Sequence, residues 1–181
     1  PGGPEATADW TYTLSGAGNM HGGRGITYGD FDEDGCSDLV VGVSTNAQVH
    51  LFYGAPTGLA PTPDQVMLAT PNSRFGWAVS GVGDVNGDGY EDLLVGAPEY
   101  GTPSFWGAAN LYAGSSSGVI DQPLWSLVGA ATDDRLGSMV DRAGDTNGDG
   151  YADLLVGWTR HYTVLVLEGS PTGPALSGPL P

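Results

Sequence analysis

Short apolar runs rich in Leu, Val and Thr alternate with glycine-rich polar turns along most of the chain. Runs of this length, bounded by Gly, Asn and Asp, are typical of β-strands rather than of helices. Strong helix formers are scarce as well, because the sequence has no lysine and few glutamates. The pattern of apolar and polar positions therefore predicts an all-β fold.

Three segments align without gaps and share one pattern, in which an acidic turn of the form Asp-x-Asp/Asn-x-Asp-Gly-x-x-Asp leads into an apolar run that ends in glycine. They are residues 30–42, 84–96 and 145–157, and their starts lie 54 and 61 residues apart. A glycine precedes each segment, and a Gly-x-x-x-Gly turn follows it. Self-similarity at such a period indicates a repeat architecture.

Each repeat contains four predicted strands, ordered from the inside of the fold to the outside. The first follows the glycine of the Phe75-Gly76 pair and of its counterparts, and the second is the apolar run after the acidic turn. Four strands in roughly 40–60 residues are typical of a β-propeller blade. The third strands are predicted at Val49 to Tyr53, Ala109 to Ala113 and Thr163 to Leu167, and the fourth strands at Val66 to Ala69 and Trp125 to Val128.

The chain divides into an N-terminal lead (1–9), three blades (about 10–63, 64–124 and 125–173) and a Pro-rich tail (174–181). Trp10 to Leu14 resembles a fourth, outer strand that comes first, whereas the third repeat stops after its third strand. We therefore expect the strand at 10–16 to complete another blade. A sheet edge left open in the third blade has to be covered in some way.

The acidic turns have the composition of a calcium site. Calcium takes six to eight oxygen ligands in flexible geometry, whereas magnesium keeps more water. Glycine at the sixth position permits the sharp turn of an EF-hand loop, but the twelfth position is valine, so the aspartate at the ninth position is expected to close the site. The predicted ligands of three Ca²⁺ ions, including the backbone carbonyl of the seventh residue in each turn, are Asp30, Asp32, Asp34, Cys36 and Asp38, then Asp84, Asn86, Asp88, Tyr90 and Asp92, then Asp145, Asn147, Asp149, Tyr151 and Asp153.

Charge and composition exclude several classes of protein. The chain has 181 residues, 5 basic and 21 acidic side chains, and a formal net charge of -16. This balance argues against a nucleic-acid binder, and no apolar run is long enough for membrane insertion. The single cysteine, Cys36, cannot form a disulfide within the chain. No nucleophile motif is present, and calcium accounts for most of the paired carboxylates, so we expect no enzymatic activity.

The repeats resemble the FG-GAP repeats of integrin α-subunit β-propellers and their bacterial relatives. The second repeat carries the whole signature, with Phe75-Gly76, the acidic turn 84–92 and Gly96-Ala97-Pro98, and the resemblance covers about residues 10–173. The first repeat has His21-Gly22 in place of Phe-Gly, and the third has Leu136-Gly137. The resemblance implies a seven-bladed propeller, calcium on the loop between strands one and two, and partner binding on the opposite face.

The expected function is non-catalytic recognition or adhesion at the cell surface or outside the cell. The alternatives are a carbohydrate-binding propeller and an accessory propeller of a secreted enzyme. The second repeat has an insertion within residues 99–106 that carries Glu99, Tyr100 and Trp106, and these residues are candidate ligand contacts. Similar aromatic pockets in every blade would favour the lectin, whereas one unique aromatic loop favours a protein partner.

Three blades are fewer than the four to eight that close a propeller. Two arrangements would complete the ring. Two chains could form a head-to-tail dimer with six blades, in which each chain donates its strand at 10–16 to the third blade of the other. Alternatively, the remainder of a longer propeller chain supplies the missing blades.

Overall fold

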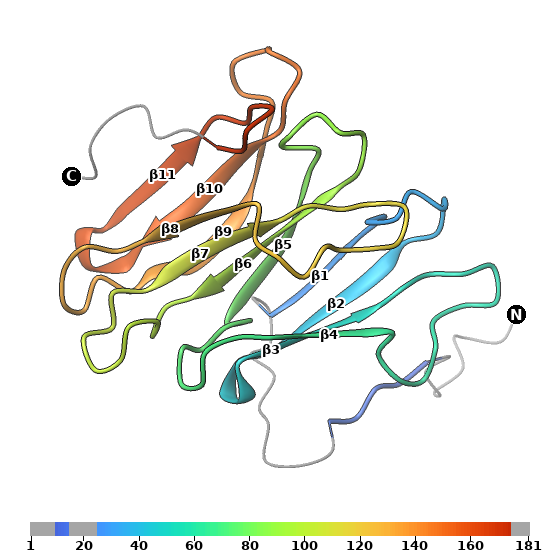
Figure 1. Ribbon diagram of the computed structural model, residues 1–181, viewed down its shortest axis with the longest axis horizontal. Helices are drawn as coiled ribbons and strands as arrows, with labels where there is room; N and C mark the ends of the chain where they lie inside the picture. Colours follow the sequence, from blue (N-terminus) through green and yellow to red (C-terminus); the bar gives the residue numbers. More distant parts are fainter. Residues whose placement is uncertain (1–9, 15–24, 175–181) are drawn as a thin grey trace, which may run out of the picture.

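The fold consists of β-sheets, as the apolar runs predict (Figure 1). The structure, a computed structural model, describes residues 10–14 and 25–174. The predicted N-terminal lead, the pair His21-Gly22, residues 15 and 16 of the expected first strand, and the tail beyond residue 174 lie outside this part of the chain. The described residues contain no α-helix, and none of their helical turns is long or apolar enough to cross a membrane.

Two blades are four-stranded antiparallel sheets whose strands pair in chain order. The first blade contains β1 (Ile26–Gly29), β2 (Asp38–Val43), β3 (Gln48–Phe52) and β4 (Gln65–Leu68). The second contains β5 (Ala78–Gly83), β6 (Asp92–Ala97), β7 (Ala108–Tyr112) and β8 (Trp125–Val128). Because β4 pairs with β3 and β8 pairs with β7, each predicted fourth strand belongs to the same blade as the three strands that come before it in the chain.

The third blade has three strands, β9 (Leu136–Gly144), β10 (Asp153–Trp158) and β11 (Thr163–Leu167). Among the described residues no fourth strand pairs with this sheet, in line with the sequence pattern. Short 3-10 helical turns, η1 (Ser44–Asn46) and η2 (Thr159–His161), connect the second and third strands of the first and third blades. The corresponding connection in the second blade is the longer segment 98–107.

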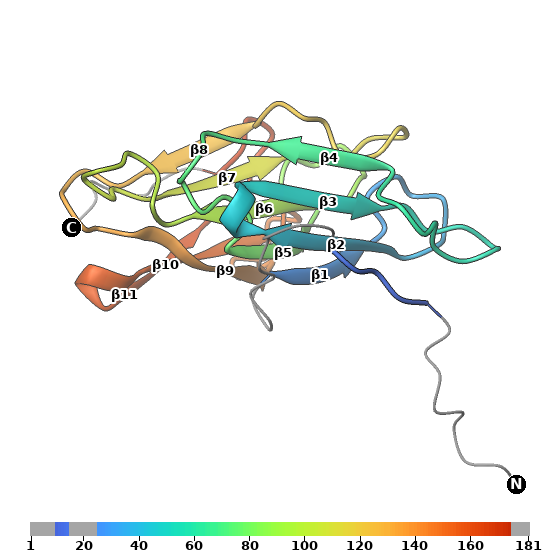
Figure 2. The same ribbon diagram turned by 90° about the horizontal axis from the view of Figure 1, so that it is seen from below.

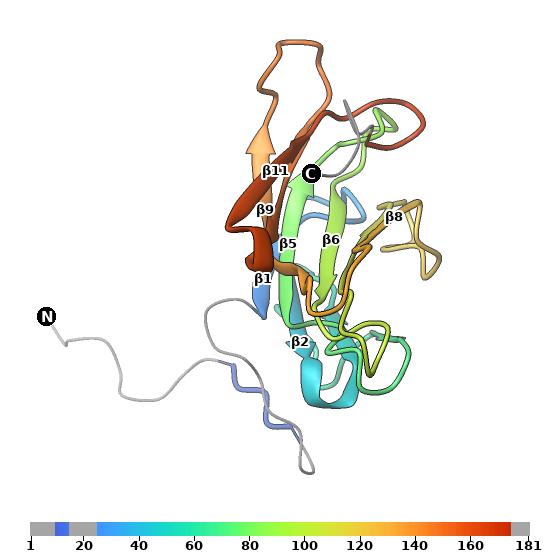
Figure 3. The same ribbon diagram turned by 90° about the vertical axis from the view of Figure 1, so that its left-hand side faces the viewer.

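The blades pack face to face, with their inner strands β1, β5 and β9 side by side (Figure 3). Val40, Val49 and Leu51 of the first blade form one core with Phe75 and Val95 of the second. A second core fills the junction between the second and third blades, and it includes Leu94, Leu111, Leu136, Leu154, Val156 and Trp158. The second strand of the middle blade, β6, is buried along its whole length because a neighbouring sheet covers each of its faces.

Glycines allow the blades to approach closely. A Cβ atom at Gly42 would lie 1.9 Å from the carbonyl oxygen of Gly76, and one at Gly96 would lie 2.0 Å from that of Gly137. In both junctions the glycine one residue before the end of a second strand meets a glycine at the start of the next blade, Gly76 or Gly137. These two glycines, which recur at the same positions of the repeat, therefore let the backbones of neighbouring blades touch.

The described part of the expected N-terminal strand packs on the first blade of its own chain. Residues 10–14 have no strand assignment, although alternate side chains along them are partly buried. The Trp10 ring packs edge-on against Phe52 at 5.2 Å, and the Tyr12 hydroxyl lies 2.7 Å from Nδ1 of His50. The predicted pairing of this segment with the third blade of another copy stays a prediction. The Trp10 and Tyr12 rings contact Phe52 and His50 of β3, and Figure 2 shows the backbone of this segment beside the first blade.

Candidate functional site

The three acidic turns occupy equivalent places, each between the first and second strands of a blade. The segment 30–38 joins β1 to β2, 84–92 joins β5 to β6, and 145–153 joins β9 to β10. The second strand begins at the ninth residue of each turn, so pairing within the blade holds the end of every turn in place.

The aspartate at the first position organises each turn through backbone N–H groups. In the second turn, Gly87, Asp88 and Gly89 donate to the carboxylate of Asp84 at 2.6, 3.1 and 2.9 Å. The third turn repeats this pattern at Asp145, and in the first turn Asp34 and Gly35 donate to Asp30. The glycine at the sixth position has φ of 87°, 92° and 93° in the three turns, a conformation that disfavours any side chain.

The side-chain oxygens at the third and fifth positions of each turn accept a second set of hydrogen bonds from backbone N–H groups. The N–H of Asp88 donates to Oδ1 of Asn86 at 2.8 Å, and the N–H of Tyr90 donates to Oδ1 of Asp88 at 3.0 Å. The third turn has the same two bonds at 2.9 Å, and the first turn has them at 3.2 and 2.7 Å. Backbone donors thus hold the side-chain oxygens of these turns in one arrangement that recurs three times.

The aspartate at the ninth position is buried and links the turn to the blade. Asp92 has no solvent exposure, and it accepts from the N–H of Val85 at 3.0 Å and of Gly114 at 3.1 Å. Asp38 and Asp153 accept the equivalent bonds from Phe31 and Gly54 and from Thr146 and Gly169. Each carboxylate therefore joins its acidic turn to the Gly-x-x-x-Gly turn of the same blade.

Burial sets the pKa values of these aspartates, and hydrogen bonds oppose it. Burial raises the pKa of Asp38 to about 6 and that of Asp92 to about 7, although two backbone donors lower each value. Burial also raises the pKa of Asp153, but the Thr146 hydroxyl and the N–H groups of Thr146 and Gly169 outweigh it, so the net shift is downward. The Thr146 hydroxyl has no counterpart in the first two repeats, where the second residue of the turn is Phe31 or Val85.

The donor set of the turns suits a hard divalent cation. In the first turn, carboxylate oxygens of Asp30, Asp32 and Asp38 all lie within 4.8 Å of one another. The ion pairs found among residues 10–14 and 25–174, Arg74 with Glu99 and His161 with Asp134, include none of the turn carboxylates. Several like charges gathered without a cationic side chain are expected to need a metal ion. Backbone carbonyl ligation by Cys36, Tyr90 and Tyr151 stays a prediction.

The inserted loop of the second blade forms a separate site. Glu99, Tyr100 and Trp106, the three candidate contacts, line one cavity of about 270 Å³. The exposed fraction is 41% for Trp106 and 37% for Tyr100, so both rings remain accessible. The Glu99 carboxylate lies 3.2 Å from Nε of Arg74.

The opposite wall of this cavity was not identified from the sequence. Thr70, Pro71 and Ser73 come from the connection between β4 and β5. Small polar residues and proline are common in turns, so residues 70–73 do not by themselves indicate a binding site. Only the unusual length of the 99–106 segment pointed to this end of the blade.

Two sequence models of repeats match the chain. The FG-GAP repeat matches residues 75–118, and the FG-GAP-like repeat matches residues 30–95. Integrin alpha-3 of Cricetulus griseus is 30% identical over 160 residues, which cover 80% of this chain and 15% of the relative. Integrin alpha-8 of Mus musculus is 32% identical over 163 residues, covering 83% and 15%, and integrin alpha-IIb of Mus musculus is 32% identical over 165 residues, covering 82% and 16%.

The chain thus spans about a sixth or less of the length of these relatives. The matches agree with the three sheets and with the close glycine contacts between them. The chain belongs to the FG-GAP repeat family, and its three sheets are blades of an FG-GAP β-propeller.

Proposed function

We propose that this chain is a calcium-binding, non-catalytic propeller module that recognises a protein partner at the cell surface or outside the cell. The observation that carries the calcium assignment is the carboxylate arrangement that recurs in three turns. The similarity to integrin α-subunits supports a role in adhesion or recognition. Three bound Ca²⁺ ions would reduce the formal net charge from -16 to -10 and relieve repulsion among the turn carboxylates.

Replacing Asp88 with alanine is expected to lower the calcium stoichiometry from three ions per chain to two. Asp88 supplies the oxygen at the fifth position and does not pair with a cation among the described residues. The same change at Asp149 should remove the ion of the third turn. Calcium content measured by equilibrium dialysis, together with thermal unfolding in calcium and after chelation, tests the assignment.

The control is Asp121→Ala, which removes an exposed carboxylate outside the turns. It should leave the stoichiometry unchanged. A stoichiometry of three in both the Asp88 and the Asp149 variants would refute the assignment of these residues as ligands.

The cavity at residues 70–73 and 99–106 supports a protein partner. The first and third blades have the short turns η1 and η2 at the equivalent place, so the Tyr100 and Trp106 pocket is particular to the second blade. Accessible aromatic rings beside a charged pair are typical contact points in protein interfaces. A lectin is expected instead to repeat its pocket in each blade.

Replacing Trp106 with alanine is expected to weaken partner binding at least about tenfold, because a central aromatic contact is typically worth more than 1 kcal/mol. Tyr162→Ala is the matched control, since Tyr162 is 98% exposed and follows η2 in the third blade. Interferometry against a panel of purified extracellular proteins measures binding, and a glycan array is probed in parallel. Glycan binding that depends on Trp106 would replace the protein partner with a carbohydrate.

A ring is expected to form from two copies of the chain joined head to tail. The first blade of one copy would then follow the third blade of the other, giving six blades with two-fold symmetry. Light scattering in calcium distinguishes this dimer from a monomer that stays folded with an open third blade.

A further inference from the structure

The blade that follows each of the first two calcium turns holds that turn in place. The N–H of Asp30 donates to Oε2 of Glu91 at 3.1 Å, and Ser115 donates to the carbonyl of Phe31 at 3.2 Å. Both donor and acceptor partners come from the second blade. The first turn is therefore positioned by contacts outside its own repeat.

The second turn receives the same kind of support from the third blade. The N–H of Ala152 donates to the carbonyl of Asp84 at 2.9 Å. The ring of Tyr151 lies against Gly87, where Cε1 is 2.5 Å from the place a Cβ atom would take. Ala152 occupies the eighth position of its turn, as Glu91 does in the second repeat.

The third turn has no such neighbour among the residues that the structure describes. Residues 145–150 are all exposed, whereas Phe31 and Val85, the equivalents of Thr146, are fully buried. The backbone hydrogen bond from Ala152 to Asp84 connects the end of this turn to the blade before it, and none of the inter-blade backbone bonds found reaches residues 145–150. The ligand residues of the third turn are thus the least supported of the three sets.

The outward face of the third blade is uncovered in the same way. Val164 is 57% exposed and Val166 is 50% exposed, whereas their equivalents Val49 and Leu51 in the first blade, and Ala109 and Leu111 in the second, are fully buried by the next blade. Gly157 is equivalent to Gly42 and Gly96, but its close contact is the Met139 side chain of its own blade.

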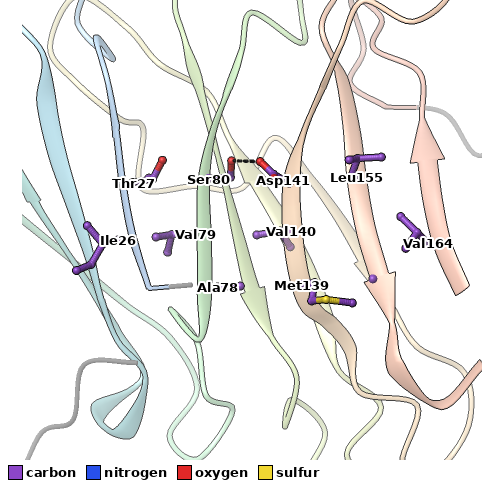
Figure 4. A pocket seen from close by; sticks show the side chains of 11 residues that line it. Ile26, Thr27, Ala78, Val79, Ser80, Met139, Val140, Asp141, Leu155 and Val164 are labelled. Atoms are coloured by element: carbon purple, nitrogen blue, oxygen red, sulfur yellow. Dashed lines mark hydrogen bonds between the residues drawn. The ribbon is translucent and has the colours of Figure 1, made fainter. Parts of the chain in front are cut away.

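This face continues into a cavity of about 430 Å³ along the inner strands (Figure 4). Met139, Leu155 and Val164 of the third blade line one part of it, and Ile26 and Thr27 of β1 line another. Ser80 of β5 donates to Oδ1 of Asp141 on β9 at 3.3 Å within it. The opening is therefore bounded by the uncovered blade.

We propose that the third calcium turn is completed by the first blade of a second copy of this chain, docked on the outward face of the third blade, so that calcium binding at this turn and dimer formation strengthen each other. The inference rests on the proposed calcium function. Linkage requires the coupling to be reciprocal: the docked blade raises calcium affinity by the factor by which calcium raises dimer affinity.

The first blade has the residues that such a contact needs. Leu39, Val41 and Phe52 occupy the positions of Leu93, Val95 and Tyr112, which pack the second blade against the first. Ser37 stands at the eighth position, where Glu91 and Ala152 reach the preceding turn. Trp10 and Tyr12 cover Phe52 and His50 in the single chain, so these rings have to move away when the copies join.

Calcium titration calorimetry at two protein concentrations, one below and one above the midpoint of dimerisation seen by sedimentation velocity, tests the coupling. Two of the three sites should keep the same affinity, and the third should bind at least about tenfold more tightly in the dimer. Val164→Asp should abolish the dimer and hold the third site at its weaker affinity. Val166→Asp is a second variant of the same face, and Ile120→Asp, at a 47% exposed position outside it, is the control.

The reciprocal experiment changes the metal site and measures assembly. Asp149→Ala should weaken dimerisation in calcium at least about tenfold, whereas Asp88→Ala should weaken it less, because the second turn is already supported within the chain. Three sites whose affinities do not depend on protein concentration, or a dimer that survives both Val164→Asp and Val166→Asp, would overturn the inference. In that case calcium binding itself would stand, whereas a chain that binds no calcium at all would overturn the proposed function first.

Discussion

Replacing Gly96 with alanine is expected to destabilise the protein by about 3 kcal/mol or more, a large part of the roughly 5–15 kcal/mol by which an ordinary domain is stable. The new Cβ atom would lie 2.0 Å from the carbonyl oxygen of Gly137 and 3.5 Å from Val140. The first of these contacts is with backbone, which cannot move away as a flexible side chain can. Relief requires the second and third blades to separate, and their common core would open with them.

The matched control is Gly157→Ala, at the equivalent position of the third blade. Its Cβ atom would meet Met139 of its own blade, with Cβ at 2.9 Å and Cε at 3.0 Å. Cε can swing away, and the contact with Cβ needs a small local shift that does not separate two blades. We expect a cost of about 1 kcal/mol, well below that at Gly96. Urea unfolding in calcium, followed by circular dichroism, measures both variants. Equal losses would mean that the contact between glycines of successive blades does not limit how closely blades pack.

Replacing Asp92 with alanine is expected to cost about 2–4 kcal/mol even in the absence of calcium. The change leaves the N–H groups of Val85 and Gly114 buried without their acceptor, and each unsatisfied donor costs about 1–3 kcal/mol. Removal of a carboxylate whose burial raises its pKa to about 7 offsets part of this loss. In calcium the cost should be larger, because the second turn also loses a ligand.

Two measurements separate these contributions. Thermal unfolding after chelation reports the lost hydrogen bonds, and the difference between unfolding with and without calcium reports the lost ligand. Asp121→Ala, which removes an exposed carboxylate, serves again as the control. An Asp92 variant as stable as the wild type after chelation would show that the two hydrogen bonds do not hold the turn to the blade.

Much of the fold could be predicted because its signals are local. The strands at Trp125 to Val128 and Thr163 to Leu167 have the predicted bounds, since each is an apolar run between turn residues. The place of the acidic turns between first and second strands follows from their spacing. Glu99, Tyr100 and Trp106 line one cavity, as an insertion with several functional side chains suggests.

The segment at 10–14 has the alternate burial of a strand but no strand assignment in the single chain. Alternation alone does not supply a hydrogen-bonding partner, and the aromatic rings of Trp10 and Tyr12 pack on Phe52 instead. The hydrogen bond between Glu91 and Asp30 of the first turn could not be predicted from the repeat pattern either, because the two residues lie 61 positions apart in the chain.

The sequence by itself determined the all-β class, the three repeats and the place of the acidic turns between first and second strands, because strand pairing within a blade and the conformation of each turn depend on residues close together in the chain. Only the tertiary structure decided which turns are supported from outside, where the wall opposite Trp106 comes from, and which blade face stays uncovered. These properties depend on contacts between blades, and the sequence of one repeat contains no information on whether a neighbour is there to make them.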